Sequence, residues 1–495
     1  MKRPLLVTSL LLLAAPLPAQ DVSAPAPTLQ QTPPPPAAPK TLVVPALAEK
    51  TLPNGIRVIV APRTGTGLVS VQMLVRGAGG SADPGNKAGL ADLTASLIGK
   101  GTTTRTAPQI ATAIETLGGS LSAGAGWDAA IVNLSVMRAR LPAAFPLFAD
   151  SVLRPRFAPD ELNRLRSQTL DALAVNLEEP GTLARYAAAR ITFGTSPYAH
   201  PLGGTLTSLK RIERADIQDF FLTSYQPGRT LLVFGGDITP GDAYTLAEKF
   251  LGGWKAVPNP SGREIARQGR TAPPYPARRI VVMDKPDAGQ AAVVITRLGI
   301  KRNDADFYTA EVMNSVLGGG FSSRLNREIR IKRGLSYGAN SAVSERLDPG
   351  PFVASAQTKN ESAPEVAQLL LDELDRIATG DLPDVELTPR KLALIGDFNR
   401  ALETGGGLSG QAASLALYGV PLGDLAEYPN RVRAVAAGDI QKFAGSRLAA
   451  KDTSVVIVGN ARLFLEALKK QFPASTVEVI PVSRLDFDSP TLIRR

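Results

Sequence analysis

A weak internal repeat is the feature that most restricts the folds open to this chain. Three short segments of the first half recur in the second half: 198–203 as 418–423, 216–220 as 439–443, and 231–236 as 455–460. They recur in the same order, and their offset drifts only from 220 to 224 residues. A repeat of this kind indicates two halves that share one fold. The length of 495 residues agrees, because one ordinary core rarely organises so long a chain.

Each half shows the same succession of predicted elements. Two apolar segments open each half and are expected to pair as strands, 56–61 with 69–75 and 279–283 with 291–298. A helix is predicted at 107–117, between the N-cap residue Thr106 and the stop at Gly118, and another at 363–379, before Gly380. Strands followed by helices predict an α+β fold with two homologous domains, each a mixed β-sheet covered by helices.

The first 19 residues are typical of a secretory signal. Lys2 and Arg3 precede an apolar run at 5–13, and small residues lead to a cleavage position after Ala19. We therefore expect a periplasmic or otherwise exported protein, with an uncleaved membrane anchor as the alternative. No second hydrophobic segment follows, so no transmembrane segment is expected after the signal is removed.

Composition sets the remaining domain boundaries. The predicted segments are a signal peptide at 1–19, a proline-rich linker at 20–45, an N-terminal domain at 46–256, an interdomain linker at 257–277, a C-terminal domain at 278–480 and a tail at 481–495. Segments so rich in proline cannot bury a core and are expected to be extended. The first linker therefore serves as a tether, and the second separates the two domains.

The residue inventory excludes several kinds of site. The whole chain holds one histidine, His200, and no cysteine. Neither a histidine- or thiolate-rich zinc site nor a Ser-His-Asp or Cys-His arrangement can therefore be assembled, and no bound metal is expected. His200 lies in a loop-like stretch and is given no role, whereas a lysine- or carboxylate-based site stays open. The net charge of +10 favours acidic peptides or anionic surfaces, or serves solubility alone.

Residues 89–102 resemble the zinc helix of a peptidase that has lost its metal-binding groups. A helix of the H-x-x-E-H kind needs two imidazoles four residues apart on one face and a carboxylate beside them as general base. Asp92, Ala95 and Ser96 stand at those three positions. This chain therefore lacks the groups that would activate water on such a helix.

A second motif, at 318–338, joins a glycine turn to a basic helix and then to a strand. It resembles the Arg/Tyr motif of the pitrilysin-like (insulinase, M16) zinc peptidases, with Arg330 and Tyr337 seven residues apart around a Gly-Leu pair. The similarity extends from about residue 45 to 475 and includes Leu-Pro-Asn-Gly at 52–55 and Lys-Gly-Thr at 100–102. The metal site is the departure, because the family's downstream glutamate falls near Asp171 or Ala172 and restores no site.

The resemblance implies roles for two groups of residues. Arg330 and Tyr337 would be catalytic, donating hydrogen bonds to the peptide carbonyl as it gains negative charge. In the family the peptide also adds as a strand to a sheet edge, and residues 118–126 match that edge. The substrate-binding residues predicted there are Gly119, Ser120, Leu121 and Ser122.

The resemblance also implies a division of labour between two chains. Bacterial members of the family pair a zinc-bearing subunit with a partner that carries the Arg/Tyr motif, and this chain resembles the second kind. We therefore expect an exported, zinc-free subunit of a heterodimeric metallopeptidase, forming half of a clamshell chamber. It would bind no cofactor itself, the zinc would lie in the partner subunit, and the substrate would be a peptide.

Several alternatives remain open at this stage. The chain could be a catalytically inactive structural or peptide-binding homologue. Arg330 could be an ordinary arginine of the basic face, and Tyr337 a half-buried aromatic residue of a strand. The glycines at 318–320 favour a turn over a phosphate cradle, and export argues against nucleic acid as the partner of the basic run 327–333.

Overall fold

The computed structural model describes residues 44–257 and 278–494. The predicted signal peptide, nearly all of the tether and all but the first residue of the predicted interdomain linker lie outside the described residues. Within those two ranges, no helix combines the length and apolar character needed to cross a membrane.

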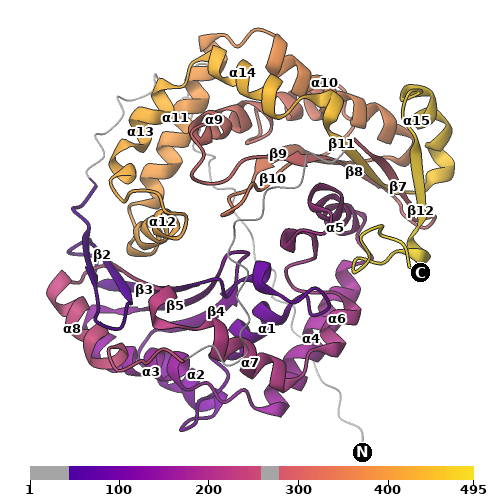
Figure 1. Ribbon diagram of the computed structural model, residues 1–495. Helices are drawn as coiled ribbons and strands as arrows, with labels where there is room; N and C mark the ends of the chain where they lie inside the picture. The colour runs from indigo at the N-terminus through magenta and orange to yellow at the C-terminus, as the bar shows by residue number, and fades with distance from the viewer. Residues whose placement is uncertain (1–43, 258–277, 495) are drawn as a thin grey trace, which may run out of the picture. The chain divides into compact units, whose positions relative to one another are not determined.

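The described residues of the first half form a six-stranded sheet with the order β1-β2-β6-β3-β5-β4 (Figure 1). The strands are β1 Ala48–Thr51, β2 Arg57–Pro62, β3 Leu68–Arg76, β4 Ser120–Ala125, β5 Ala129–Met137 and β6 Thr230–Gly236. β2 and β6 run parallel, and the other neighbours run antiparallel. The sheet is therefore mixed, as the sequence predicts.

The second half repeats this plan with the order β12-β7-β11-β8-β10-β9. The strands are β7 Ile280–Asp284, β8 Ala291–Leu298, β9 Ala339–Val343, β10 Pro351–Thr358, β11 Ser454–Gly459 and β12 Val477–Pro481. Five strands correspond in order between the sheets, from β2 and β7 to β4 and β9. The sixth differs, because β1 precedes β2 and runs antiparallel to it, whereas β12 follows late in the chain and runs parallel to β7.

The expected pairing of the opening strands is wrong. β6 lies between β2 and β3, so that Leu232 is the register partner of both Val58 and Met73. In the same way β11 lies between β7 and β8. β6 and β11 are buried along their whole length and are apolar after their first residues, Thr230 and Ser454, which suits a central strand covered on both faces.

The helices of the described residues cover these sheets. In the first half they are α1 Leu90–Leu97, α2 Ala107–Thr116, α3 Leu141–Leu153, α4 Pro159–Asn176, α5 Pro180–Phe193, α6 Leu206–Arg211, α7 Arg214–Ser224 and α8 Pro240–Leu251. In the second half they are α9 Phe307–Leu317, α10 Ala363–Thr379, α11 Asp384–Ala401, α12 Gly405–Leu417, α13 Asp424–Ala434, α14 Ala437–Arg447 and α15 Leu465–Gln471. The two helices predicted from the sequence are α2 and α10. As expected, the Thr106 hydroxyl caps α2 by accepting from the Gln109 N–H.

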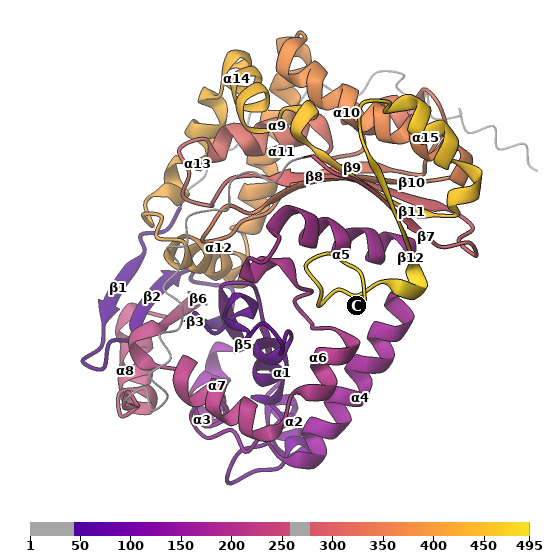
Figure 2. The same ribbon diagram turned by 45° about the vertical axis from the view of Figure 1, so that its right-hand side comes forward.

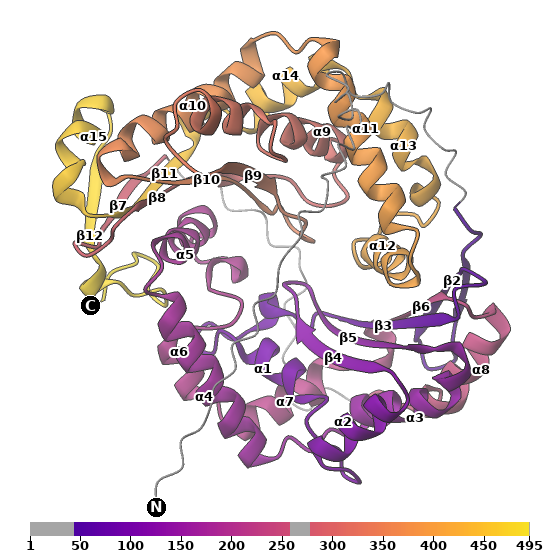
Figure 3. The same ribbon diagram turned by 180° about the vertical axis from the view of Figure 1, so that it is seen from behind.

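The two halves exchange one helix each. α5, from the first half, packs against β8 and β11 of the second sheet, on the face opposite to α10 (Figure 2). α12, from the second half, packs against β2, β3 and β6 of the first sheet (Figure 3). Each sheet is therefore covered on one face by its own helices and on the other by a helix from the other half.

Glycines allow the close approach of α12 to the first sheet. A Cβ atom on Gly235 of β6 would lie 2.2 Å from the carbonyl oxygen of Gly405, the first residue of α12. A side chain at that position would force the helix away from the strand.

The last described residues, set apart as a tail in the sequence analysis, pack against α5. Leu492 is fully buried in the cluster that α5 forms with the second sheet. The Arg190 guanidinium of α5 donates to the carbonyl oxygen of Phe487 at 2.5 Å, and the Tyr186 and Phe487 rings meet edge to face. These contacts add to the burial of α5 between the two halves.

Candidate functional site

α1 begins at Gly89, which has φ +90° and a backbone conformation that favours glycine. The Asp83 carboxyl group caps this helix, accepting from the backbone N–H of Gly89 and of Ala91 at 2.7 Å each. Because Asp83 is buried, its pKa is raised to about 8. The helix that would carry a zinc motif is thus a regular, well-capped element.

The side chains at the motif positions of α1 do not suit a zinc ion. The Asp92 carboxylate accepts from the Ala125 N–H of β4 at 3.3 Å, and burial raises its pKa. Ala95 is buried and has no ligand atom, and Ser96 offers only a hydroxyl group. Asp171 lies exposed on α4. In the part of the chain that the structure describes, no group of three His, Cys, Asp or Glu residues could hold a metal. We assign no metal chemistry to α1.

β4 is the terminal strand of the first sheet and pairs only with β5 among the described strands. Ser120 and Ser122 are exposed, while Leu121 is half-buried and packs against the core on the opposite face of the strand. Gly119 precedes the strand, close to the Ser135 carbonyl of β5. The predicted substrate-binding residues therefore lie at the start of an edge strand, the kind of element to which a peptide strand can add, whereas at the end of β4 the Ala125 N–H is bonded to Asp92.

A pocket of about 480 Å³ opens beside the start of β4. Gly119, Ser120 and Leu121 form part of its wall, and the rest comes from the end of α1, from α2 and from α4. Lys100, Glu115 and the ion-paired Glu161 and Arg164 supply its charge. Its volume lies in the usual range for ligand pockets of roughly 300–1,000 Å³.

The Arg/Tyr motif folds as a glycine turn, a short helix and a loop that leads into β9. Where the sequence predicts a basic helix, residues Asn326–Ile331 form a π-helix, labelled η5. The Asn326 amide donates to the Gly320 carbonyl and accepts from the Ala339 N–H, at 3.1 and 3.0 Å. The Ser336 hydroxyl braces the loop by bonding to both backbone groups of Gly338. The backbone that carries the motif is thus held at the turn, in the helix and at the strand.

Arg330 differs from the other basic residues around η5. Four of them form ion pairs: Arg324 and Arg327 with Glu386, and Lys332 and Arg333 with Glu328. The Arg330 guanidinium makes no ion pair or hydrogen bond to any described residue and lies 4.7 Å from the ring centroid of Phe321. Phe321 is itself 64 % exposed. The guanidinium donors of Arg330 therefore face solvent and remain available.

Tyr337 lies in the loop before β9 and is 89 % exposed. It is not the half-buried strand residue of the alternative interpretation. Its hydroxyl has no hydrogen-bond partner within residues 44–257 and 278–494. Arg330 and Tyr337 thus present two unused donors at the edge of the second sheet, where β9 is the terminal strand.

His200 is buried and structural in its contacts. Its ring nitrogens lie 2.9 Å from the Pro201 carbonyl oxygen and 3.1 Å from that of Gly80, and its ring contacts Trp127. Burial lowers its pKa. These contacts tie two loops together near the start of α1.

Two family models match this chain. The model described as Insulinase (Peptidase family M16) matches residues 57–206, and the model described as Peptidase M16 inactive domain matches residues 211–394. Together they cover more than half of the chain. The chain belongs to peptidase family M16.

Its relatives include proteins named as zinc proteases and one named as a non-peptidase homolog. An uncharacterized zinc protease of Mycobacterium tuberculosis is 29 % identical over 356 residues, which are 71 % of this chain and 80 % of the relative. The non-peptidase homolog YmxG of Helicobacter pylori is 24 % identical over 400 residues, or 79 % and 89 % of the two chains. The chain is thus similar over most of its length to M16 proteins of both descriptions.

Solved M16 structures share the fold. The peptidase M16 inactive domain from Pseudomonas fluorescens has a TM-score of 0.77 and 26 % identity, covering 83 % of this chain and 98 % of that one. A protease from Helicobacter pylori has a TM-score of 0.79 and 21 % identity, covering 84 % and 99 %. This chain is accordingly an M16 protein of the inactive type, with two M16-like domains.

The sequence analysis missed the residues that support this M16 motif. Glu328 holds two cations of the run, and its spacing to Lys332 was a visible signal for one of them. Glu386, which holds Arg324 and Arg327, lies far along the chain and gave no signal. Phe321 stood within the glycine motif but was assigned no contact with Arg330.

Proposed function

We propose that this chain is the zinc-free subunit of a heterodimeric M16 metallopeptidase and that Arg330 and Tyr337 act on the substrate peptide. One observation carries the proposal: among the described residues Arg330 is the member of its basic run without an acidic partner, and Tyr337, seven residues later, is exposed. Basic side chains commonly pair with nearby acids, as the four neighbours of Arg330 do. An unpaired guanidinium on a braced backbone is suited to a ligand from outside the chain.

The chemistry of the two side chains fits a peptide carbonyl. A guanidinium and a phenol each donate to an oxygen that gains negative charge, and preorganised donors lower the barrier because they need no rearrangement during the reaction. The partner's zinc would supply the activated water. The role of this chain would be to bind the carbonyl oxygen and to stabilise its developing charge.

The edge of the first sheet supports a second part of the proposal. A peptide added to β4 would gain backbone hydrogen bonds with little sequence preference, and the exposed Ser120 and Ser122 leave the strand accessible. The adjoining pocket could hold one of the peptide side chains. The first half would then hold the bound peptide at β4, and Arg330 and Tyr337 of the second half would polarise its carbonyl group.

The test is peptide hydrolysis with added zinc by three preparations: this chain alone, an exported M16 chain with an intact H-x-x-E-H motif alone, and the two mixed. Activity that arises only in the mixture supports a complementing subunit. No gain on mixing would sink the proposal.

Variants separate the Arg/Tyr role from assembly. We expect Arg330→Ala and Tyr337→Phe each to lower kcat of the complex about 10²–10³-fold, the usual effect of removing one such donor. Arg327→Ala is the matched control on the same helix and should leave turnover near the unmodified value. Size-exclusion chromatography should show the complex intact in all three, and unchanged turnover in both Arg330→Ala and Tyr337→Phe would refute the assignment.

A second candidate is a peptide-binding M16 homologue without catalysis. The relative named as a non-peptidase homolog favours it, as does the open edge of β4, which needs no partner to bind a strand. In that case the chain alone would bind peptides, Ala123→Pro would weaken the binding by removing an outward-facing N–H of the edge, and mixing with a zinc-bearing chain would add no hydrolysis.

Export completes the proposal. The N-terminal sequence supports secretion with cleavage after Ala19. N-terminal sequencing of the protein recovered from the periplasm or medium of the producing cells should begin at Gln20, whereas retention of Met1 in the cytoplasm would contradict export.

A further inference from the structure

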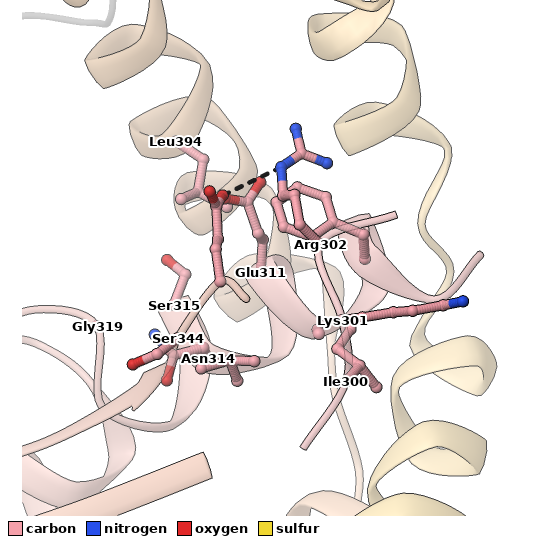
Figure 4. A pocket seen from close by; sticks show the side chains of 13 residues that line it. Ile300, Lys301, Arg302, Glu311, Asn314, Ser315, Gly319, Ser344 and Leu394 are labelled. Carbon is pink, nitrogen blue, oxygen red and sulfur yellow. Dashed lines mark ion pairs between the residues drawn. The ribbon is translucent and has the colours of Figure 1, made fainter. Parts of the chain in front are cut away.

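Two adjoining cavities lie within the second half, among α9, α11, α12 and α13 and next to the end of β9. Their volumes are about 150 and 240 Å³. They share five lining residues: Arg302, Phe307, Glu311, Glu345 and Leu394. Figure 4 shows the first of them, in which the Glu311 carboxyl group comes close to the guanidinium of Arg302. We treat the two as one cavity, the Glu311 cavity.

The Arg302 cation inside the Glu311 cavity is already engaged. Arg302 is only 7 % exposed, and its guanidinium lies over the Phe307 ring, 3.6 Å from the centroid. Its Nε lies 3.1 Å from a Glu345 carboxylate oxygen. Lys301 extends away from these groups (Figure 4). The charge of Arg302 is thus largely balanced by Glu345.

Glu311 lacks a full set of partners. Its Oε2 atom is buried and has no hydrogen-bond partner among the described residues, although the Tyr428 hydroxyl bonds to the carboxyl group. Burial, and to a smaller degree the negative charge of Glu345, raises the pKa of Glu311 to about 7. Leaving a buried carboxyl oxygen without a donor is unfavourable, so a donor that enters the cavity is favoured.

The other acidic groups of the cavity do not compete for such a donor. Asp424 pairs with Arg431 and accepts from the Tyr308 hydroxyl, and Asp397 pairs with Arg400. Beside them, an apolar wall is formed by Leu394, Phe398, Leu415 and Leu425. The cavity therefore combines one unsatisfied acidic oxygen with an aliphatic and aromatic surface.

We propose that the Glu311 cavity binds an alkylammonium group, with Glu311 accepting from the ammonium and the apolar wall covering the alkyl stem. This inference does not depend on the proposed peptidase role. The two parts of the Glu311 cavity measure about 150 and 240 Å³, so each part holds only a small group. The occupant is therefore a short amine chain, supplied either as a free amine or as a single lysine side chain.

Calorimetric titration of the purified full chain tests the ligand class with four probes. We expect saturable binding of n-butylammonium and no binding of 1-butanol, which lacks the charge, or of butyrate, which reverses it. Nα-acetyl-lysine methylamide tells the sources apart: its binding supports a lysine side chain as occupant, and its failure beside bound n-butylammonium supports a free amine. Binding of butyrate or equal binding of butanol would overturn the proposal, as would the absence of any binding by n-butylammonium.

Variants locate the site. Glu311→Gln keeps the shape of the side chain but removes the anion, and should weaken n-butylammonium binding at least tenfold. Leu394→Trp should block the cavity and abolish binding while leaving Glu311 in place. Glu466→Gln, on a side chain that is 81 % exposed outside the cavity, is the matched charge control and should bind normally. Full affinity in both cavity variants, with unchanged thermal unfolding, would place the amine elsewhere and refute the inference.

Discussion

Gly89 is the N-cap residue of α1, and its backbone conformation sets the direction in which the chain enters this helix. Its φ of +90° suits glycine, and a Cβ atom there would lie 2.9 Å from both the Gly203 carbonyl oxygen and the Gly204 Cα. Backbone atoms cannot yield as a flexible side chain can. A residue without any metal-binding role thus fixes the entry into the helix that carries the altered zinc motif.

We predict that Gly89→Ala lowers the free energy of unfolding by about 2–3 kcal/mol, from backbone strain together with the backbone clash. Gly85→Ala is the control, because Gly85 has open space around its Cβ position and no positive φ. Urea unfolding of the two variants measures the difference. Equal stability of both would show that the turn before α1 adapts freely.

For Arg330 and Tyr337, the sequence predicted the motif but not the contacts of the side chains. The spacing of Arg330 and Tyr337 indicated the motif, and Tyr337 is exposed as that role requires. Residue spacing could not show that Arg330, alone in its run, has no acidic partner among the described residues. The acid Glu386 that neutralises Arg324 and Arg327 comes from another helix, and only folding brings them together.

At the scale of one element, η5 depends on Glu328. The side chains of Lys332 and Arg333 both donate hydrogen bonds to this carboxylate. These two bonds lower the pKa of Glu328 from its ordinary value of 4.5 to about 2. A depressed pKa means that this stabilisation is fully present above pH 4.5 and is lost as the pH falls through 2. The position of Arg330, two residues later on η5, relies on the same ion pairs.

We predict that Glu328→Gln destabilises the chain by about 2 kcal/mol at pH 6 and by clearly less at pH 3, where the native carboxylate has lost most of its advantage. Urea unfolding of the unmodified protein and the variant at both pH values gives the comparison. Glu466 forms an exposed ion pair with Lys469 on α15, so Glu466→Gln controls for general charge effects. A penalty that stays constant between the two pH values would contradict the ionic origin of the effect.

α5 belongs to the first half in sequence but packs against the sheet of the second half. Leu183 is 2 % exposed and packs in the cluster that contains Val294 of β8 and Val456 of β11, although it belongs in sequence to the first half. The stability of the second sheet therefore depends on a helix encoded before it.

We predict that Leu183→Ala lowers the free energy of unfolding by about 3 kcal/mol, the usual cost of a cavity in a core. Hydrogen exchange should speed up in β8 and β11 more than in β3, because α5 covers the second sheet. Leu206→Ala, at a leucine that is 38 % exposed, should change little. Faster exchange confined to the first sheet would show that α5 does not stabilise the second one.

At the scale of the whole molecule, the two halves are joined by more than the chain between them. α5 and α12 are exchanged, and the Thr192 and Thr296 hydroxyls bond to each other at 2.7 Å between α5 and β8. The buried Asp128 of the first half also accepts from the Leu347 N–H of the second at 3.1 Å. Separating the halves would expose one face of each sheet.

We therefore predict that the halves stay together when the chain is cut between residues 257 and 278. A specific protease site inserted there would allow cleavage of the folded protein. The cut protein should elute from a size-exclusion column at the volume of the uncut protein and unfold in one transition. Two separate peaks of half size would contradict the stabilising effect of the exchanged helices.

The sequence alone was enough to predict the features that depend on short segments or on overall composition. The repeat predicted two α+β halves, periodicity and caps predicted α2 and α10, and one histidine with no cysteine ruled out a histidine- or thiolate-based zinc site. The tertiary structure decided the order of the strands, the exchange of α5 and α12, the isolation of Arg330 and the unsatisfied oxygen of Glu311. The physical reason is that several strands are equally apolar, and their neighbours are chosen by the packing of the complete core, which no local segment contains.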